Sequence, residues 1–274
     1  MKELFTRGIS GILYVSLLII SMYWPIALLV ILGVFGIISL AEFTKLIKLR
    51  SFVVPVIIFI SLYFGFWYWC LIHKSSQGTN EAIQILLVIT IFVNLILIKD
   101  LFTTSRIPLF ESKRYIVTTF YLTSGFVFML LIANYLNTFT PYLLLGTFLL
   151  VWVNDSFAYL VGKNFGRQKL FPSISPKKTV EGFLGGLFFA CVSSYFISEY
   201  IGIISFTNWL ILAIIVSVFG TLGDLIESKF KRQADVKDSG VIMPGHGGLL
   251  DRLDSIIFAS PFIYLFLRIL TYVS

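Results

Sequence analysis

The chain has 274 residues, of which 58% are hydrophobic, 17% aromatic and only 13% charged, and its net charge at pH 7 is +7. Soluble globular domains carry about a quarter charged residues, so this composition excludes a water-soluble globule and indicates a polytopic membrane protein. Because there is no soluble basic domain, the positive charge argues against nucleic-acid binding and indicates membrane topology and attraction of anionic substrates.

Apolar runs follow one another along the chain, and most are long enough to cross about 30 Å of hydrocarbon at about 1.5 Å per helical residue. They cover residues 8–24, 26–43, 53–73, 82–98, 116–133, 141–162, 182–204, 208–228 and 255–272. We therefore predict an all-α polytopic integral membrane protein with about nine transmembrane helices. The first run continues through Trp24 and Pro25 without a small-residue cleavage site, which predicts a retained span rather than a signal peptide.

The basic residues gather in alternate loops between these runs. If the N-terminus is cytoplasmic, all but two of the 21 Lys and Arg residues fall on the cytoplasmic side, the exceptions being Lys74 and Arg268. The positive-inside rule therefore predicts a multi-pass protein of the cell membrane, with the N-terminus cytoplasmic and the C-terminus extracytoplasmic. Residues 163–181 and 229–254 are then expected in the cytoplasm.

Polar residues divide the chain into two parts. The spans within residues 1–140 are nearly free of ionisable groups, and we expect them to provide a scaffold or oligomer contacts. Polar groups enter the spans of residues 141–274, which we expect to form a catalytic transmembrane region. Cys70 and Cys191 lie in separate apolar runs and predict two buried thiols without metal-type spacing.

Two carboxylates in the second part lie at similar depths. Asp155 follows about 20 Å of apolar helix that begins at Pro141, and Asp224 follows about 22 Å that begins at Trp209. Both positions are several ångströms short of the cytoplasmic boundary of the hydrocarbon core. An ionisable group there is costly unless it faces a partner or a polar cavity, so both residues are candidates for a functional site.

Polar residues share one face of the predicted helix that contains the second of these carboxylates. At the helical spacings i, i+3, i+4 and i+7 they are Asp224, Glu227, Ser228 and Lys231. Interhelical salt bridges that hold a bundle together explain such a stripe equally well. Two polar loops on the same side, residues 162–182 and 229–255, favour a polar site at the cytoplasmic end of the C-terminal helices.

The stretch SPKKT, residues 175–179, reads as the entry to a helix with Pro176 in its first turn. The amides of a helix start and the ammonium groups of Lys177 and Lys178 suit a polyphosphate. A solvated turn is the commoner interpretation of this motif alone. The chain contains no G-x-x-x-x-G-K-[ST] sequence, which argues against a Walker-type ATPase.

The stretch PGHGGLLDRLDS, residues 244–255, precedes the last apolar run. Asp251 and Asp254 lie on one face of the predicted helix, and the glycines allow an abrupt turn before it. With Asp224 they offer oxygen ligands without cysteine or clustered histidine, a set that suits Mg²⁺, and Mg²⁺ suits a triphosphate. For the lone His246 we expect a phosphate contact rather than a metal bond.

These motifs together resemble the signature of a known family. The segments SKFKR (228–232), KD (237–238) and PGHGGLLDRLD (244–254) resemble phosphatidate cytidylyltransferases, also called CDP-diacylglycerol synthases. The likeness spans about 154–255, and the first 140 residues agree with the family only in hydropathy. It implies transfer of CMP from CTP to phosphatidate, giving CDP-diacylglycerol and pyrophosphate in phospholipid biosynthesis, with Mg²⁺ as cofactor and a second cation left open.

The resemblance also implies roles for individual residues. The expected metal ligands are Asp224, Asp251 and Asp254. The expected catalytic residues are Asp224, Asp251, Ser228, Lys231 and Arg232. The expected substrate-binding residues are Asp155, Ser175, Lys177, Lys178, Lys237, Asp238, His246 and Arg252. The expected partners are CTP, phosphatidate and the lipid bilayer, with a homodimer left open.

Two alternative functions remain at this stage. A CTP-dependent lipid kinase of the dolichol-kinase type would share many spans and a basic cytoplasmic site, and only analysis of its product separates it. A membrane transporter would need a polar path to the outer face, yet the outer halves of these spans carry few candidate groups.

Overall fold

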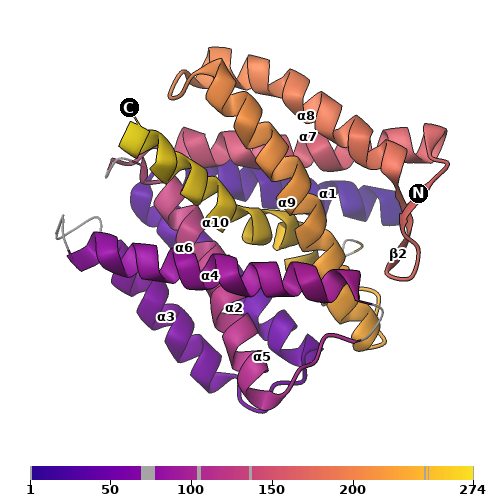
Figure 1. The fold of residues 1–274 in the computed structure, drawn as a ribbon, viewed down its shortest axis with the longest axis horizontal. Helices are drawn as coiled ribbons and strands as arrows, with labels where there is room; N and C mark the ends of the chain where they lie inside the picture. Colours follow the sequence, from indigo (N-terminus) through magenta and orange to yellow (C-terminus); the bar gives the residue numbers. More distant parts are fainter. Residues whose placement is uncertain are drawn as a thin grey trace.

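The structure is a computed structural model that describes residues 2–68, 78–103, 106–135, 138–243, 245 and 247–273, with backbone only for residues 2–7, 78–79 and 272–273. It is a bundle of helices that cross at varied angles, with a short β-hairpin at one end (Figure 1). The elements are α1 (Lys2–Ser21), α2 (Pro25–Leu46), α3 (Val53–Trp67), α4 (Gly78–Phe102), α5 (Glu111–Val117), the π-helical η2 (Thr118–Thr123), α6 (Ser124–Ile132), α7 (Pro141–Phe165), β1 (Lys169–Phe171), β2 (Ser175–Thr179), α8 (Val180–Ile201), α9 (Phe206–Gln233) and α10 (Leu250–Val273).

Each predicted apolar run contains a helix. Within the described ranges, seven helices are long and apolar enough to cross a membrane, namely Pro25–Leu46, Asn80–Phe102, Glu111–Ile132, Pro141–Phe165, Val180–Ile201, Phe206–Gln233 and Leu250–Thr271. The first and third runs contain shorter apolar helices, Gly8–Ser21 and Val53–Trp67. The end of the third run, with Cys70, lies outside the described residues. The all-α, multi-pass class predicted from hydropathy is confirmed.

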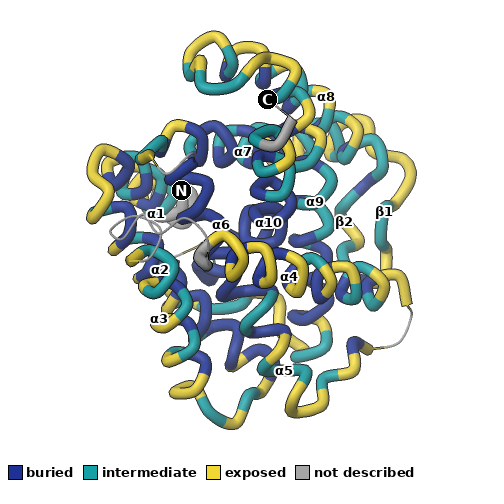
Figure 2. The backbone as a smooth tube through the Cα atoms, turned by 60° about the vertical axis from the view of Figure 1, so that its left-hand side comes forward, coloured by how far each residue is buried: buried dark blue, intermediate teal, exposed yellow. Residues whose placement is uncertain are grey.

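The last helix, α10, lies at the centre of the bundle and packs against α9 and α6 (Figure 2). Its residues Ile257, Phe258 and Ile263 are fully buried. A Cβ atom added at Gly125 of α6 would lie 2.7 Å from the carbonyl oxygen of Ile257, so only glycine permits this approach of α6 to α10. The hydroxyl of Ser260 donates a hydrogen bond to the Gly125 carbonyl at 2.9 Å and fixes the crossing.

Helix α7 packs along α8, and α8 packs along α9. A Cβ atom at Gly182 would lie 2.7 Å from the carbonyl oxygen of Ala158, and one at Gly186 would lie 2.6 Å from that of Asn154. Small residues at such positions let the backbones of membrane helices come close together. The turn of α7 that carries Asp155 is thereby held next to the first turns of α8.

Apolar side chains fill the bundle at the end where α9 begins and α10 finishes. Trp209, Leu212 and Val216 of α9 are buried, as are Ile263 and Leu267 of α10. The polar stripe of α9 begins only beyond this part of the helix. The described part of the bundle is therefore apolar at one end of α9 and polar at the other.

The SPKKT stretch is a β-strand rather than the first turn of a helix, which corrects the prediction. Its strand, β2, pairs antiparallel with β1, and helix α8 begins only at Val180. The cap of α8 is Thr179, whose hydroxyl accepts a hydrogen bond from the Gly182 amide at 3.1 Å. Glu181 fixes the base of the hairpin, because its carboxylate accepts hydrogen bonds from the amides of Arg167 and Gln168 at 3.0 and 3.1 Å.

The segment between α9 and α10 makes the sharp turn that its glycines predict. Gly245 and Gly247 have positive φ angles of 76° and 88°, and the Met243 amide donates to the Gly247 carbonyl at 3.0 Å. Helix α10 begins at Leu250. The prediction that Asp251 and Asp254 lie in a helix that follows a glycine turn is confirmed.

Candidate active site

The residues of the predicted polar stripe of α9 contact one another along the helix. The Ser228 hydroxyl donates to Asp224 Oδ1 at 3.2 Å, one turn earlier on the same face. The Lys231 ammonium forms an ion pair with Glu227, again one turn away. Glu227, Ser228 and Lys231 are all buried, so the stripe faces other elements of the protein.

Lys178 of the hairpin reaches into this stripe. Its ammonium lies 2.6 Å from Asp224 Oδ2, and the two side chains are 27% and 30% exposed. Burial alone would lower the pKa of Lys178, but the carboxylates of Asp224 and Asp155 outweigh it and raise the pKa above its ordinary value. The ammonium therefore stays protonated at neutral pH, and it connects the hairpin to α9.

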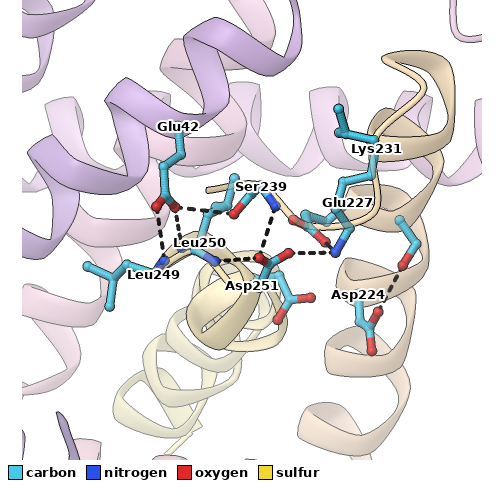
Figure 3. A network of polar contacts seen from close by, with 12 residues as sticks. Glu42, Asp224, Glu227, Lys231, Ser239, Leu249, Leu250 and Asp251 are labelled. Atoms are coloured by element: carbon cyan, nitrogen blue, oxygen red, sulfur yellow. Dashed lines mark hydrogen bonds and ion pairs between the residues drawn. The ribbon is translucent and has the colours of Figure 1, made fainter. Parts of the chain in front are cut away.

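Asp251 is the best-bonded carboxylate of the cluster (Figure 3). Its Oδ1 lies 2.6 Å from the Lys231 ammonium, and its Oδ2 accepts hydrogen bonds from the amides of Ser239 and Gly248 at 2.9 and 2.7 Å. Lys231 thus lies between Glu227 of its own helix and Asp251 of α10. This arrangement joins the ends of α9 and α10 through one buried ammonium.

Asp155 and Asp254 extend the cluster onto α7 and α10. The Asp155 carboxylate is exposed, accepts a hydrogen bond from the Asn154 amide group at 3.3 Å, and interacts electrostatically with Asp224 and Lys178. Asp254 is buried, accepts from the Ser255 amide at 2.8 Å, and interacts electrostatically with Asp224 and Asp155. Side chains from α7, β2, α9 and α10 therefore form one electrostatically coupled site.

Carboxylates outnumber lysines in this site. The carboxylates are those of Asp155, Asp224, Glu227, Asp251 and Asp254, and the lysines are Lys178 and Lys231. The Arg252 guanidinium also acts on Asp155, but it does not balance the remaining charge. Negative charge without a partner is costly at a buried position, and a bound cation would reduce that cost.

The predicted metal ligands are not arranged as one set. Both oxygens of Asp251 are engaged by Lys231 and by two backbone amides, and both oxygens of Asp224 are engaged by Lys178 and by the Ser228 hydroxyl. Asp254 interacts electrostatically with Asp224. Within the described ranges, no three His, Cys, Asp or Glu side chains converge as a ready metal cage. The carboxylate chemistry at Asp224 and Asp254 fits Mg²⁺, which prefers oxygen ligands and retains several waters, and its binding here stays a prediction.

Comparison with known proteins places the chain in a family. The sequence profile described as "Cytidylyltransferase family" matches residues 5–270. The chain belongs to the cytidylyltransferase family. It is 33% identical over 277 residues to the phosphatidate cytidylyltransferase of Bacillus subtilis strain 168, an alignment that covers 98% of each chain. The phosphatidate cytidylyltransferases of Staphylococcus aureus strain COL and Staphylococcus saprophyticus are 48% and 49% identical over 45% of this chain and 48% of theirs.

Arg232 of this cytidylyltransferase-family chain binds backbone rather than the acidic cluster. Its guanidinium donates to the Ile174 carbonyl at 3.3 Å and to the Val236 carbonyl at 3.1 Å. Ile174 lies in the turn of the β-hairpin, so Arg232 holds the hairpin against the end of α9. A catalytic role for Arg232 stays a prediction, and its observed contacts support a structural one.

The remaining predicted substrate-binding residues lie on the hairpin, in the segment before α10 and on the first turn of α10. Ser175 and Lys177 lie on β2 beside Lys178, with Lys177 exposed. Lys237 and Asp238 are exposed in the segment before α10, and Arg252 is exposed on the first turn of α10. His246 lies outside the described residues.

Glu42 is a member of the polar network that the sequence analysis missed. It lies near the end of α2, is 4% exposed, and accepts hydrogen bonds from the amides of Leu249 and Leu250 at 3.2 and 2.8 Å. The expectation that the spans before residue 140 are nearly free of ionisable groups overlooked it. The available signal was an acidic residue at the end of an apolar run, where an ionisable group is a candidate for function.

Proposed function

We propose that the chain is a phosphatidate cytidylyltransferase. A phosphate oxygen of phosphatidate attacks the α-phosphorus of CTP, and a new P–O bond forms between them. The bond from the α-phosphorus to the oxygen that bridges it to the β-phosphorus breaks, and pyrophosphate leaves. The products are CDP-diacylglycerol and pyrophosphate, and the reaction requires no covalent intermediate on the protein.

The observation that carries this proposal is the polar cluster at the ends of α7, α9 and α10, joined by Lys178. A lipid phosphate must remain near the headgroup level while its acyl chains stay in hydrocarbon, and a nucleotide must arrive from water. A cluster located where long apolar helices become polar meets both demands. Membership of the cytidylyltransferase family, and the alignment over 98% of a phosphatidate cytidylyltransferase from Bacillus subtilis, support the same substrates.

Within this proposal, the lysines of the cluster bind phosphate. Lys178 and Lys231 are protonated donors whose present partners are carboxylates, and phosphate oxygens are acceptors of the same kind. Lys177, Lys237 and Arg252 add positive charge around them, and His246 adds a phosphate contact. Ser175 and Ser228 position the phosphates by hydrogen bonding, and Asp155 and Asp238 complete the wall of the site.

Mg²⁺ belongs to the proposal as the cation that the excess carboxylates favour. Asp224 and Asp254 would hold it, with Asp224 giving up its ion pair with Lys178. Asp251 would join them only by giving up its bond to Lys231 or its amide donors. When bound, the ion supplies neutralisation of negative charge on the triphosphate. The protein groups orient the two anionic substrates and exclude water from the reacting phosphorus.

The proposal includes an orientation and an assembly. The site lies on the cytoplasmic side, with the N-terminus cytoplasmic and the C-terminus outside, because nearly all Lys and Arg residues lie on that side.

Two copies form a homodimer through the N-terminal helices. Light scattering of the detergent-solubilised protein measures the number of copies, and a mass of one copy would contradict the dimer.

The reaction is tested with purified protein, phosphatidate, Mg²⁺ and CTP labelled either at the α-phosphate or at the γ-phosphate. We expect the α-label in a chloroform-soluble liponucleotide and the γ-label in pyrophosphate. A CTP-dependent lipid kinase would give the opposite result, with the γ-label in the lipid. Label confined to water-soluble products in both reactions would overturn the proposal.

A further inference from the structure

Helix α2, from the part of the chain expected to provide a scaffold or oligomer contacts, places the Glu42 carboxylate at the start of α10, beside the site. Glu42 Oε1 accepts from the Leu249 amide and Oε2 from the Leu250 amide, at 3.2 and 2.8 Å. These amides belong to the start of α10, where backbone donors lack partners within the helix. A negative charge at this end of a helix is also stabilised by the helix dipole.

Ser239 connects Glu42 to the catalytic cluster (Figure 3). Its hydroxyl donates to Glu42 Oε2 at 3.2 Å, while its amide donates to Asp251 Oδ2 at 2.9 Å. Asp251 in turn binds the Lys231 ammonium at 2.6 Å. A continuous path of hydrogen bonds and one ion pair therefore leads from α2 to the lysine expected to bind phosphate.

Two glycines of the segment before α10 lie too close to the Glu42 carboxylate to be replaced by a larger residue. A Cβ atom at Gly240 would lie 2.3 Å from Glu42 Oε1, and one at Gly248 would lie 2.6 Å from Glu42 Oε2 and 2.1 Å from the Ser239 hydroxyl. No side chain fits at either position unless these groups move. Glu42 therefore restricts where the backbone can run at Gly240 and Gly248.

A helix cap with no other role would affect only folding. Glu42 differs from such a cap because the backbone that it contacts also donates hydrogen bonds to Asp251. Both amides that donate to Asp251 Oδ2, those of Ser239 and Gly248, belong to the segment that Glu42 fixes. A shift of this segment would change the hydrogen bonds of Asp251 and, through Asp251, the position of Lys231.

We propose that Glu42 is a positioning residue for Asp251 and Lys231, acting through Ser239 and the first amides of α10. This inference rests on the proposed cytidylyl transfer. Loss of a group that orients a metal-binding side chain commonly costs about 10–100-fold in metal affinity or activity. We take the same range for a group that orients Asp251. We expect a loss of that size in kcat from Glu42→Gln, with a much smaller change in the KM for CTP.

The experiment compares Glu42→Gln with the parent protein in the CDP-lipid assay, with kcat expressed per folded molecule after size-exclusion chromatography in detergent. Glu111→Gln is the matched control, because Glu111 is a 52% exposed carboxylate that pairs with Arg50 away from the site. The control should keep parental kcat. Ser239→Ala should lower kcat, and adding it to Glu42→Gln should cause little further loss, because both act through one path.

Hydrogen exchange provides a readout that does not depend on turnover. The amides of Leu249 and Leu250 should exchange faster in Glu42→Gln than in the parent, while those in the middle of α10 remain protected. Parental kcat in Glu42→Gln, or fully multiplicative losses with Ser239→Ala, would overturn the positioning role. If the parent itself formed no CDP-lipid, the proposed function would fail instead, and unchanged exchange at residues 249–250 would still reject the role of Glu42.

Discussion

Lys178 and Asp224 show how a single contact joins two parts of the site. Lys178 comes from a hairpin outside the spans, and Asp224 comes from the polar stripe of α9, yet their charged atoms lie 2.6 Å apart. The ammonium sits where a cation or a phosphate-bound metal would also be attracted. Substrate binding is therefore expected to redistribute the partners of Lys178 between carboxylate and phosphate.

Replacing Lys178 with Gln removes the charge while keeping a long polar side chain. We expect kcat/KM for CTP to fall about 10–100-fold, because a hydrogen bond to a charged group contributes about 1.5–3 kcal/mol. Lys169→Gln is the control, since Lys169 is an exposed lysine of the same hairpin, paired across the strands with Thr179. Steady-state kinetics measure kcat/KM for CTP in both variants. An equal fall in kcat/KM in the two variants would show that Lys178 contributes only general positive charge.

The three aspartates of the predicted metal set should behave differently from one another. Asp224→Asn and Asp254→Asn should raise the Mg²⁺ concentration needed for half-maximal activity, because each removes charge near the expected ion. Asp251→Asn differs because it breaks a buried ion pair with Lys231. We expect it to lower the free energy of unfolding by about 3 kcal/mol. Titration with Mg²⁺ and thermal unfolding in detergent measure the two effects. An unchanged Mg²⁺ requirement in both Asp224→Asn and Asp254→Asn would exclude them as metal ligands.

At the scale of an element, the end of α9 directs its basic residues to separate targets. Lys231 faces the acidic cluster, Arg232 holds the hairpin turn, and Lys229 points to the end of α4. The Lys229 ammonium donates to the carbonyls of Asp100 and Thr103 at 2.5 and 2.8 Å, at a helix end where a cation is favourable. The Thr103 hydroxyl also donates to the Asp100 carbonyl, at 2.8 Å. The end of α9 thus contacts α10, the hairpin turn and the end of α4 through three basic residues that are close in sequence.

Lys229→Met should reduce stability while leaving the chemistry intact. The methionine keeps the apolar length of the side chain but removes the charged donor to the Asp100 and Thr103 carbonyls, at a cost of about 2 kcal/mol. We expect a lower unfolding temperature in detergent and parental kcat per folded molecule. Lys231→Met is the contrasting variant, in which kcat itself should fall. A large loss of kcat in Lys229→Met would show that this lysine also serves the reaction.

At the scale of the whole molecule, local patterns in the sequence predicted the spans and the stripe of Asp224, Glu227, Ser228 and Lys231. Span length and helical periodicity depend on neighbouring residues, so a single sequence reveals them. The strand at SPKKT depends on pairing with β1, and the contacts of Arg232 depend on where the hairpin lies. Glu42 bonds Leu250 across 208 positions of the chain, a contact that no local pattern contains.

The proposed orientation of the molecule is predicted from charge alone, and cysteine accessibility tests it. In a background with Cys70 and Cys191 replaced by Ser, Ser173→Cys in the hairpin turn and Thr207→Cys at the start of α9 are both exposed positions. In intact cells, an impermeant thiol reagent should label position 207 and leave position 173 unlabelled until the cells are opened. Labelling of position 173 in intact cells would reverse the orientation.

The apolar packing at the far ends of α9 and α10 has a consequence for the cell's ion gradients. A charged cluster inside a bilayer could serve as half of a leak for protons or metal ions. Leu212 and Val216 of α9, together with Ile263 and Leu267 of α10, are buried beyond the cluster, and their aliphatic side chains offer no polar groups to replace the hydration shell of an ion. A lipid-modifying enzyme built in this way can keep carboxylates within the membrane and still preserve the potential across it.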